Sequence, residues 1–303
     1  MHVTMMDGTV YIPLATRGVL SVSGPDARSF LQGMVSNDME KVDSATAIYA
    51  GLLSPQGKFL HDFFIAMDGD AFLLDCERDR MGELARRLTM FRLRAKADIA
   101  DRSEEFSVMA VVGAGTVETL GLAPERGRAR PFGGGIAFVD PRLADLGART
   151  ILPADTAVSS FREAGLEEGD LAAYEKLRLS LGIPDGSRDI VVDRAFLLES
   201  NFEELHGVDF TKGCYVGQEN TSRQKYRGTV RKRLLPVRVD GPLPEPGTPV
   251  LMGEKEVGTI RSGFDGQAMA LLRLEYVDEA KSSGTALKAG EATVTPVPPA
   301  WAS

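Results

Sequence analysis

The hydropathy pattern of this chain changes character in its last third, and this change restricts the folds that the chain can adopt. Up to residue 181, short apolar runs alternate with stretches such as 27–34 and 81–88, whose apolar residues recur at helical spacing. Beyond residue 235, prolines punctuate short strands and helical periodicity disappears. The pattern predicts an α+β scaffold with helices on one face of a sheet, followed by a small closed or half-closed β-barrel.

Turn residues and apolar runs predict the individual elements and three parts of the chain. A helix over 171–181 should end at Gly182, the glycine-rich stretch 127–135 should be a loop, and the tail 296–303 should be loosely held. The expected strands are 19–22, 48–53, 63–67, 71–76, 108–112, 136–139, 235–239 and 269–274. The expected parts are an N-terminal α+β domain (1–105), a second α+β part (106–228) and the C-terminal barrel (229–303).

Charge and cysteine usage argue against several classes of protein. The formal net charge of -8 leaves no excess of positive charge to neutralise phosphates, so nucleic acid is not an expected partner. No apolar run approaches the ~20 residues that cross a bilayer, and the first eight residues do not resemble a secretory signal. The two cysteines, Cys76 and Cys214, suggest no disulfide framework, so a cytoplasmic location is expected.

The stretch Lys212–Glu219 has the strongest chemical character in the chain. Gly213 and Gly217 frame Cys214, which indicates a turn, and Lys212 and Arg223 lie close in sequence to stabilise a thiolate. One cysteine cannot hold an iron–sulfur cluster alone, because clusters take about four thiolate ligands. Any bound cluster would therefore need further ligands from a partner or a small molecule. Spacing alone leaves open a second interpretation, in which Cys214 is a small buried apolar residue, as we expect for Cys76.

Lys212–Glu219 resembles the signature octapeptide of the YgfZ family, a branch of the folate-binding proteins related to the glycine cleavage T-protein. Its flanks resemble the iron–sulfur assembly members of that family at Glu199–Asn201, Gly207–Val208, Phe210–Thr211, Thr221, Arg223, Gly228, Val230 and Arg231–Arg233. The N-terminal half resembles the scaffold shared with the T-protein at Gly24–Ala27, Phe30–Gly33, Asn37–Asp38 and Leu53–Lys58. The resemblance implies two α+β layers around a central cavity, followed by a β-barrel.

The resemblance also implies a function, which is assembly or repair of iron–sulfur clusters, of the four-iron type, in other proteins. Cys214 would be a transient cluster ligand or redox-active thiol, with Lys212 and Arg223 lowering its pKa or holding an anionic ligand. Tetrahydrofolate and a cluster shared with a partner are the implied cofactors, and assembly proteins and cluster-containing client proteins are the implied partners. The implied cofactor-binding residues are Gly213, Tyr215, Gly217, Gln218, Glu219, Asn201 and Arg178.

Two positions depart from the T-protein pattern. His61 stands where the aminomethyltransferases have an aspartate that assists catalysis, and Asp62 matches the neighbouring acid. Ser180 stands where T-proteins have a pterin-binding glutamate. His61 itself could carry a proton or bind a ligand, although beside a strand we expect an ordinary, partly exposed histidine. Both departures favour an assembly factor over an aminomethyltransferase.

Two other functions stay open at this point. One is a folate-dependent aminomethyl- or methyltransferase that uses Asp62 or a nearby acid. The other is a non-catalytic, folate-sensing regulator of tRNA modification, which would not need Cys214. The basic run Arg231–Arg233 could bind a polyanion, or it could be a solvated charge cluster where two domains join.

Overall fold

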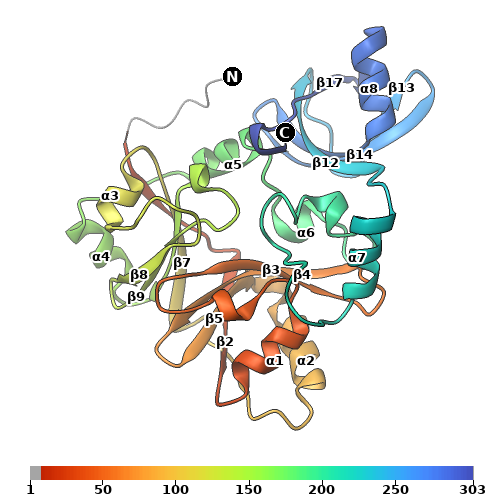
Figure 1. The fold of residues 1–303 in the computed structure, drawn as a ribbon. Coiled ribbons are helices and arrows are strands. Elements are labelled where there is room, and N and C mark those ends of the chain that lie inside the picture. Colours follow the sequence, from red (N-terminus) through yellow and green to blue (C-terminus); the bar gives the residue numbers. More distant parts are fainter. Residues whose placement is uncertain (1–7, 303) are drawn as a thin grey trace.

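The structure is a computed structural model that describes residues 8–302. The first seven residues, to which the expectation about a secretory signal applies, lie outside the described residues. Figure 1 shows two β-sheets with their helices, coloured red to green, and a blue β-barrel at the C-terminal end. Among the described helices, none is both long enough and apolar enough to cross a membrane.

The first sheet is antiparallel and is covered by helices on one face. Its spatial order is β3 (Ile48–Leu53), β4 (Phe59–Asp68), β5 (Ala71–Glu77), β2 (Arg17–Ser23) and β6 (Asp98–Asp101). Helices α1 (Ala27–Met34) and α2 (Met81–Arg92) bury their apolar stripes in one core against this sheet. Both helices predicted from the 3.6-residue periodicity are confirmed.

The second sheet has six strands, and one of them comes from the beginning of the chain. Its order is β11 (Glu167–Glu168), β1 (Val10–Pro13), β7 (Phe106–Val112), β10 (Ala148–Pro153), β9 (Gly135–Val139) and β8 (Ala129–Phe132). Only the pairing of β1 with β11 is parallel. Helices α3 (Thr116–Leu120) and α4 (Ala157–Glu163) pack on its outer face.

The predicted loop over 127–135 is wrong in part, because it contains the edge strand β8. Gly133 and Gly134 have φ values of 54° and 79°, so they form the tight turn that joins β8 to β9. Pro131 is tolerated because β8 has a neighbour on one side only. The strand shows no hydropathy alternation, since its two central residues are exposed.

The two sheets face each other across a core that combines aromatic rings with buried charge. The guanidinium groups of Arg17, Arg142 and Arg149 lie 5.8, 4.8 and 4.1 Å from the centroid of the Phe64 ring. Arg17 and Arg149 both pair with the fully buried Asp75, at 2.5 and 2.6 Å. Removing one partner of such a pair leaves an uncompensated buried charge, so these residues join the sheets in one arrangement.

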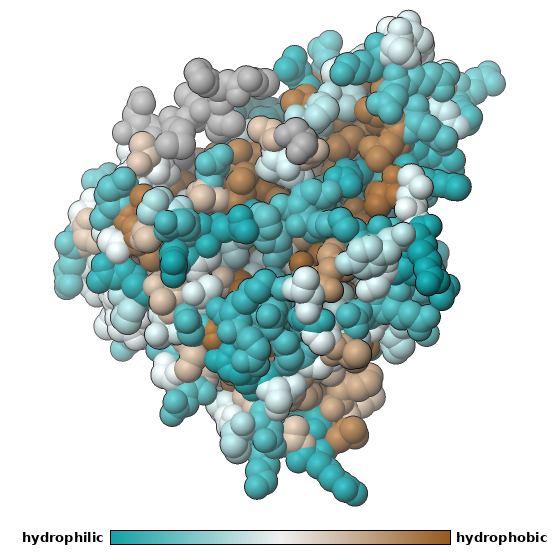
Figure 2. Space-filling model, viewed as in Figure 1, coloured by the Kyte–Doolittle hydropathy of each residue, from teal (hydrophilic) through white to brown (hydrophobic). Residues whose placement is uncertain are grey.

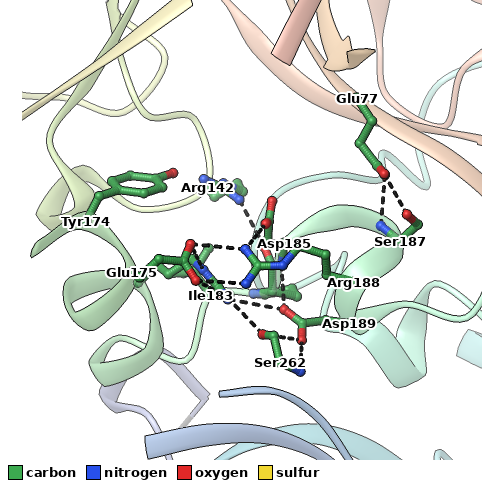
Figure 3. Close-up of polar contacts among 12 residues, drawn as sticks. Glu77, Arg142, Tyr174, Glu175, Ile183, Asp185, Ser187, Arg188, Asp189 and Ser262 are labelled. Carbon is green, nitrogen blue, oxygen red and sulfur yellow. Dashed lines mark hydrogen bonds and ion pairs between the residues drawn. The ribbon is translucent and has the colours of Figure 1, made fainter. Parts of the chain in front are cut away.

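Short helices connect the second sheet to the barrel. Helix α5 (Leu171–Ser180) and helix α6 (Gly186–Asp189) carry a polar network that reaches strand β14 (Lys255–Phe264) of the barrel. Asp189 accepts hydrogen bonds from the main-chain N–H and the hydroxyl of Ser262, and it pairs with Arg178. Figure 3 shows Glu175, Asp189 and Ser262 close together in this network, in which all three contact the guanidinium of Arg178. The five described 3₁₀ turns are η1 (Met39–Lys41), η2 (Arg78–Arg80), η3 (Ala144–Leu146), η4 (Leu198–Ser200) and η5 (Ala300–Ala302).

The barrel is closed and has six strands. Around it run β12 (Lys232–Asp240), β15 (Gln267–Arg273), β14 (Lys255–Phe264), β13 (Pro249–Met252), β16 (Leu287–Ala289) and β17 (Ala292–Pro296). The expectation that helices disappear here is wrong, because α8 (Leu274–Ser283) packs on the barrel. None of its residues is fully buried, so its apolar stripe is short and weak in the sequence.

The tail also differs from its prediction. The indole of Trp301 packs against the central core and donates a hydrogen bond of 2.7 Å to the carbonyl of Leu181. The segment is therefore tied to the end of α5 rather than loosely held. The α+β scaffold with a C-terminal β-barrel is confirmed, while the division at residues 105 and 228 stays a prediction.

Candidate functional site

The motif Lys212–Glu219 crosses from a loop into a helix. Its first six residues form the loop, and α7 (Gln218–Arg227) begins at the seventh. The predicted turn is therefore corrected for Gln218 and Glu219, which form the first helical turn. Glycine suits the position before the helix, because Gly217 has a φ of 83°.

Lys212 fastens the start of this loop to the end of α1. Its side chain is buried, and Nζ donates to the carbonyl oxygens of Gln32, Val35 and Asn37 at 2.8, 2.7 and 2.7 Å. These carbonyls lie at or just beyond the C-terminal turn of α1, where helical acceptors have no partner and a cation is favoured. Burial lowers the pKa of Lys212 to about 8. An ammonium has three donors, so none remains for a thiolate or an anionic ligand.

Cys214 is exposed at the tip of the loop. The main-chain N–H of Val216 donates to the carbonyl of Gly33 at 3.1 Å, so the loop is fastened to α1 on both sides of the cysteine. Gly213 is exposed as well. The alternative in which Cys214 is a small core residue is therefore excluded. Cys76 is buried as expected, and burial raises the pKa of its thiol to about 12.

Gly217 brings the motif against the turn between β3 and β4. A Cβ atom at residue 217 would lie 2.5 Å from the carbonyl oxygen of Ser54 and 3.1 Å from Cα of Gly57. The side-chain amide of Asn220 also donates to the carbonyl of Gln56 at 2.8 Å. The family resemblance covers two segments that are far apart in the sequence, Leu53–Lys58 and Lys212–Glu219. The fold places these two segments in contact.

A groove of ≈ 920 Å³ lies beside the motif. Residues 215–219, the exposed face of α7, Pro55 and Phe91 line it. Tyr215 forms part of its floor, and burial raises the pKa of this phenol to about 12. Arg223 lines the groove and pairs with Glu219 at 3.1 Å, one helical turn away. The fold thus gathers Tyr215, Gly217, Gln218, Glu219 and Arg223 around one surface next to Cys214.

Arg178 and Asn201 lie elsewhere and link the scaffold to the barrel. The guanidinium of Arg178 is buried among Glu175, Asp189 and Ser262. The amide of Asn201 donates to the carbonyl of Leu234 in β12 at 2.8 Å. Neither residue lines the groove.

His61 and Asp62 point to opposite sides of β4. Asp62 faces the interface between the sheets, where the hydroxyl of Tyr49 donates to it at 2.9 Å, whereas His61 faces α2 and lies 3.8 Å from Glu83. The expected exposure of His61 is wrong, because α2 covers its side of the sheet and only 3% of the residue is exposed. Burial, together with Arg80, lowers the pKa of His61 to about 4, and burial raises that of Asp62 to about 6 against the pull of Arg17.

The pterin position offers no carboxylate. The hydroxyl of Ser180 donates to the carbonyl of Leu177 at 2.7 Å, within its own helix. A serine turned in this way does not fit the recognition of a pterin by a glutamate. Among residues 8–302, no group of three or more His, Cys, Asp or Glu side chains is arranged to hold a metal ion.

Two family models match the chain at its two ends. The model described as the GCVT N-terminal domain matches residues 2–125. The model described as the CAF17 C-terminal beta-barrel domain matches residues 231–303, which include all six barrel strands.

Curated relatives match most of the chain. The mouse protein named iron-sulfur cluster assembly factor IBA57, mitochondrial, is 35% identical over an alignment of 308 positions. The alignment covers 94% of this chain and 83% of the mouse protein. The human protein of the same name is 36% identical, and the match covers 86% of this chain and 76% of the human protein. The Neurospora crassa homolog is 36% identical, covering 77% of this chain and 54% of its own.

These names overturn the prediction of a cytoplasmic location, because the mouse, human and Neurospora crassa relatives are all named as mitochondrial. The prediction used the absence of a disulfide framework. Two cysteines without a disulfide do not distinguish one compartment of the cell from another.

A solved structure shares the fold. Glycine cleavage system aminomethyltransferase T from Bartonella henselae superposes with a TM-score of 0.79, covering 99% of this chain and 87% of its own, at 16% identity. This likeness confirms the predicted T-protein-like architecture and no more than that. The extent and identity of the mouse and human matches show that the chain belongs to the IBA57 family of iron–sulfur cluster assembly factors, and its fold is that of the glycine cleavage T-protein.

Proposed function

We propose that this protein helps to assemble or repair iron–sulfur clusters, of the four-iron type, in client proteins, with the cluster as cargo. The observation that carries the proposal is the exposed thiol of Cys214 on a loop that Lys212 and Val216 fasten to α1. A thiol held at a fixed, accessible point can bind iron without a search through conformations. The names of the curated relatives support the same function.

A partner must complete the ligand set. Clusters take about four thiolates, whereas the second cysteine of this chain, Cys76, is buried within strand β5, in the core that this sheet forms with α1 and α2. Cys214 would therefore be one ligand of a cluster whose other ligands belong to an assembly or client protein. In this proposal Lys212 positions the loop through the α1 carbonyls, and Arg223 and Arg227 supply the positive charge next to it.

Replacement of Cys214 in cells tests the proposal. Cys214→Ala and Cys214→Ser should each abolish maturation of an endogenous four-iron enzyme in a strain that depends on this protein. Cys76→Ala is the matched control and should retain activity if the protein level is equal, because its thiol is inaccessible. Full enzyme activity with Cys214→Ala would refute the role of the thiol.

Folate has no step in this proposal. Tetrahydrofolate would have to bind without the pterin carboxylate, because Ser180 is turned toward its own helix. Ser180 also argues against an aminomethyltransferase, which needs the pterin carboxylate. A folate sensor that regulates tRNA modification would not use the exposed thiol of Cys214. Titrating tetrahydrofolate against the wild type and Cys214→Ala under anaerobic conditions, with and without iron and sulfide, separates these alternatives. Only an assembly factor needs the thiol to bind iron, whereas a transferase or a folate sensor should bind folate equally well without it.

A further inference from the structure

Large apolar side chains are exposed at the C-terminal end of α2, the segment that reaches the groove through Phe91. Phe91 lines the groove, and its neighbours Met90 and Leu93 are 62% and 87% exposed. Leu93 has a φ of 47°, a conformation that costs a non-glycine residue free energy. Tyr226 of α7, which also lines the groove, is 68% exposed. Figure 2 shows apolar surface at the lower right of the molecule, where Figure 1 places α2 below α7.

The groove is basic although the chain as a whole is acidic. Arg223 and Arg227 line it, and Arg94 is exposed directly after Leu93. The lining also includes one acidic residue, Glu219, which pairs with Arg223, so two arginines and one carboxylate leave the lining with a net charge of +1. The net charge of the chain is -8, so this local excess of cations is opposite in sign to the charge of the chain as a whole. A basic rim around exposed apolar residues complements an acidic protein surface with an apolar centre.

We propose that the groove between α2 and α7 docks the acidic face of a cluster-carrying protein and thereby brings its thiolates to Cys214. This inference rests on the function proposed above and adds the chemistry of the partner. A cluster held by thiolates carries negative charge, which Arg223 and Arg227 attract. A single-stranded RNA also fits cations beside aromatic rings. The exposed aliphatic residues Met90 and Leu93 and the adjacent thiol favour a protein, because neither has a use in binding RNA.

Thiol chemistry can measure this preference, because Cys76 is buried with its thiol pKa raised to about 12 and Cys214 is the accessible thiol. The probes are three peptides of equal length with a Leu-Cys-Phe centre, flanked by Glu, Ser or Lys. Each cysteine is activated as a mixed disulfide with thionitrobenzoate. The Cys214 thiolate attacks the peptide sulfur, a new disulfide forms, and the coloured thionitrobenzoate anion leaves with the electron pair of the broken bond.

We expect the acidic peptide to react with the full-length protein about tenfold faster than the basic peptide at low salt, with the Ser peptide between them. About 1 M salt should reduce the ratio to less than about twofold. Arg223→Gln/Arg227→Gln should reduce it to about threefold or less. The control Lys281→Gln/Lys288→Gln removes the same charge from the barrel and should keep the ratio. Met90→Ser/Leu93→Ser should slow all three peptides equally.

Equal rates for the three peptides on the wild type would overturn the inference, and so would a charge preference that persists in Arg223→Gln/Arg227→Gln. Protection of Cys214 by oligouridylate but not by the acidic peptide would assign the groove to RNA instead. Failure of the proposed function looks different. If the proposed function alone is wrong, cells with Cys214→Ala would keep the activity of the four-iron enzyme, while the wild-type protein would still react fastest with the acidic peptide.

Discussion

His61 and Asp62 should give this protein two opposing pH dependences that offset each other in the wild type. The residues are adjacent in β4 but face different cores, and each is 3% exposed. Nε2 of His61 and Oδ1 of Asp62 have no hydrogen-bond partner among the described residues. Burial therefore disfavours the charged form of both groups, which lowers the pKa of the base and raises that of the acid.

The sign of each effect follows from its pKa values in the folded and unfolded chain. His61 falls from 6.5 to about 4, so its contribution is present above pH 6.5 and is lost as the pH falls toward 4. Asp62 rises from 3.8 to about 6, so its contribution is present below pH 3.8 and is lost as the pH rises through 6. Between about pH 5 and pH 7.5, linkage gives a gain of about 2 kcal/mol from His61 and a loss of about 1.4 kcal/mol from Asp62.

Single substitutions should separate the two effects. Relative to the wild type, Asp62→Asn should become more stable by about 1.4 kcal/mol between pH 5 and pH 7.5. His61→Gln should become less stable by about 2 kcal/mol over the same interval. Equilibrium unfolding in urea at four pH values measures both, provided that the slope with denaturant is unchanged. Asp155→Asn, on an exposed loop, is the control and should follow the wild type. Parallel profiles for all four proteins would refute the reasoning from burial.

Four further substitutions, one of them a control, test the geometry of the site and the barrel joint by urea unfolding. Gly217→Ala should reduce the free energy of unfolding by about 2–4 kcal/mol, because φ is 83° and the new methyl group would meet Ser54. The control, Gly213→Ala, should reduce it by less than about 0.5 kcal/mol, because a Cβ atom there meets nothing within 4 Å. Lys212→Met should cost about 2–3 kcal/mol by leaving three carbonyls without their donor, and an unchanged stability would show that water replaces the ammonium. Asp189→Ala should reduce the free energy of unfolding by about 3–5 kcal/mol, because the main-chain N–H groups of Asp185 and Ser262 lose their acceptor and the buried Arg178 keeps only Glu175 as a carboxylate partner. A cost below about 1 kcal/mol would contradict that role.

The elements that the sequence identifies well are those with a local periodicity and one dominant burial pattern. Strand β3 has the predicted limits, Ile48–Leu53, because all six of its residues are apolar or glycine and all are buried. Helix α1 buries every residue of its predicted stripe. Helix α8 and strand β8 are missed, since neither buries a continuous apolar face. The motif around Cys214 is identified by its local resemblance to a family signature, because residue types and spacing alone leave open a small buried cysteine.

The sequence by itself determined the scaffold class, the barrel and the segment that holds the exposed thiol. Only the tertiary structure decided what the neighbours of that thiol do. Lys212 stands two residues from Cys214, yet its charge is held by α1 carbonyls some 175–180 residues away. The groove next to Cys214 is lined by residues that are far apart in the sequence, such as Phe91 and Tyr226. The burial of His61 likewise depends on α2. Local pattern cannot encode these contacts, because side-chain direction and burial are set by whichever distant segment packs against each face.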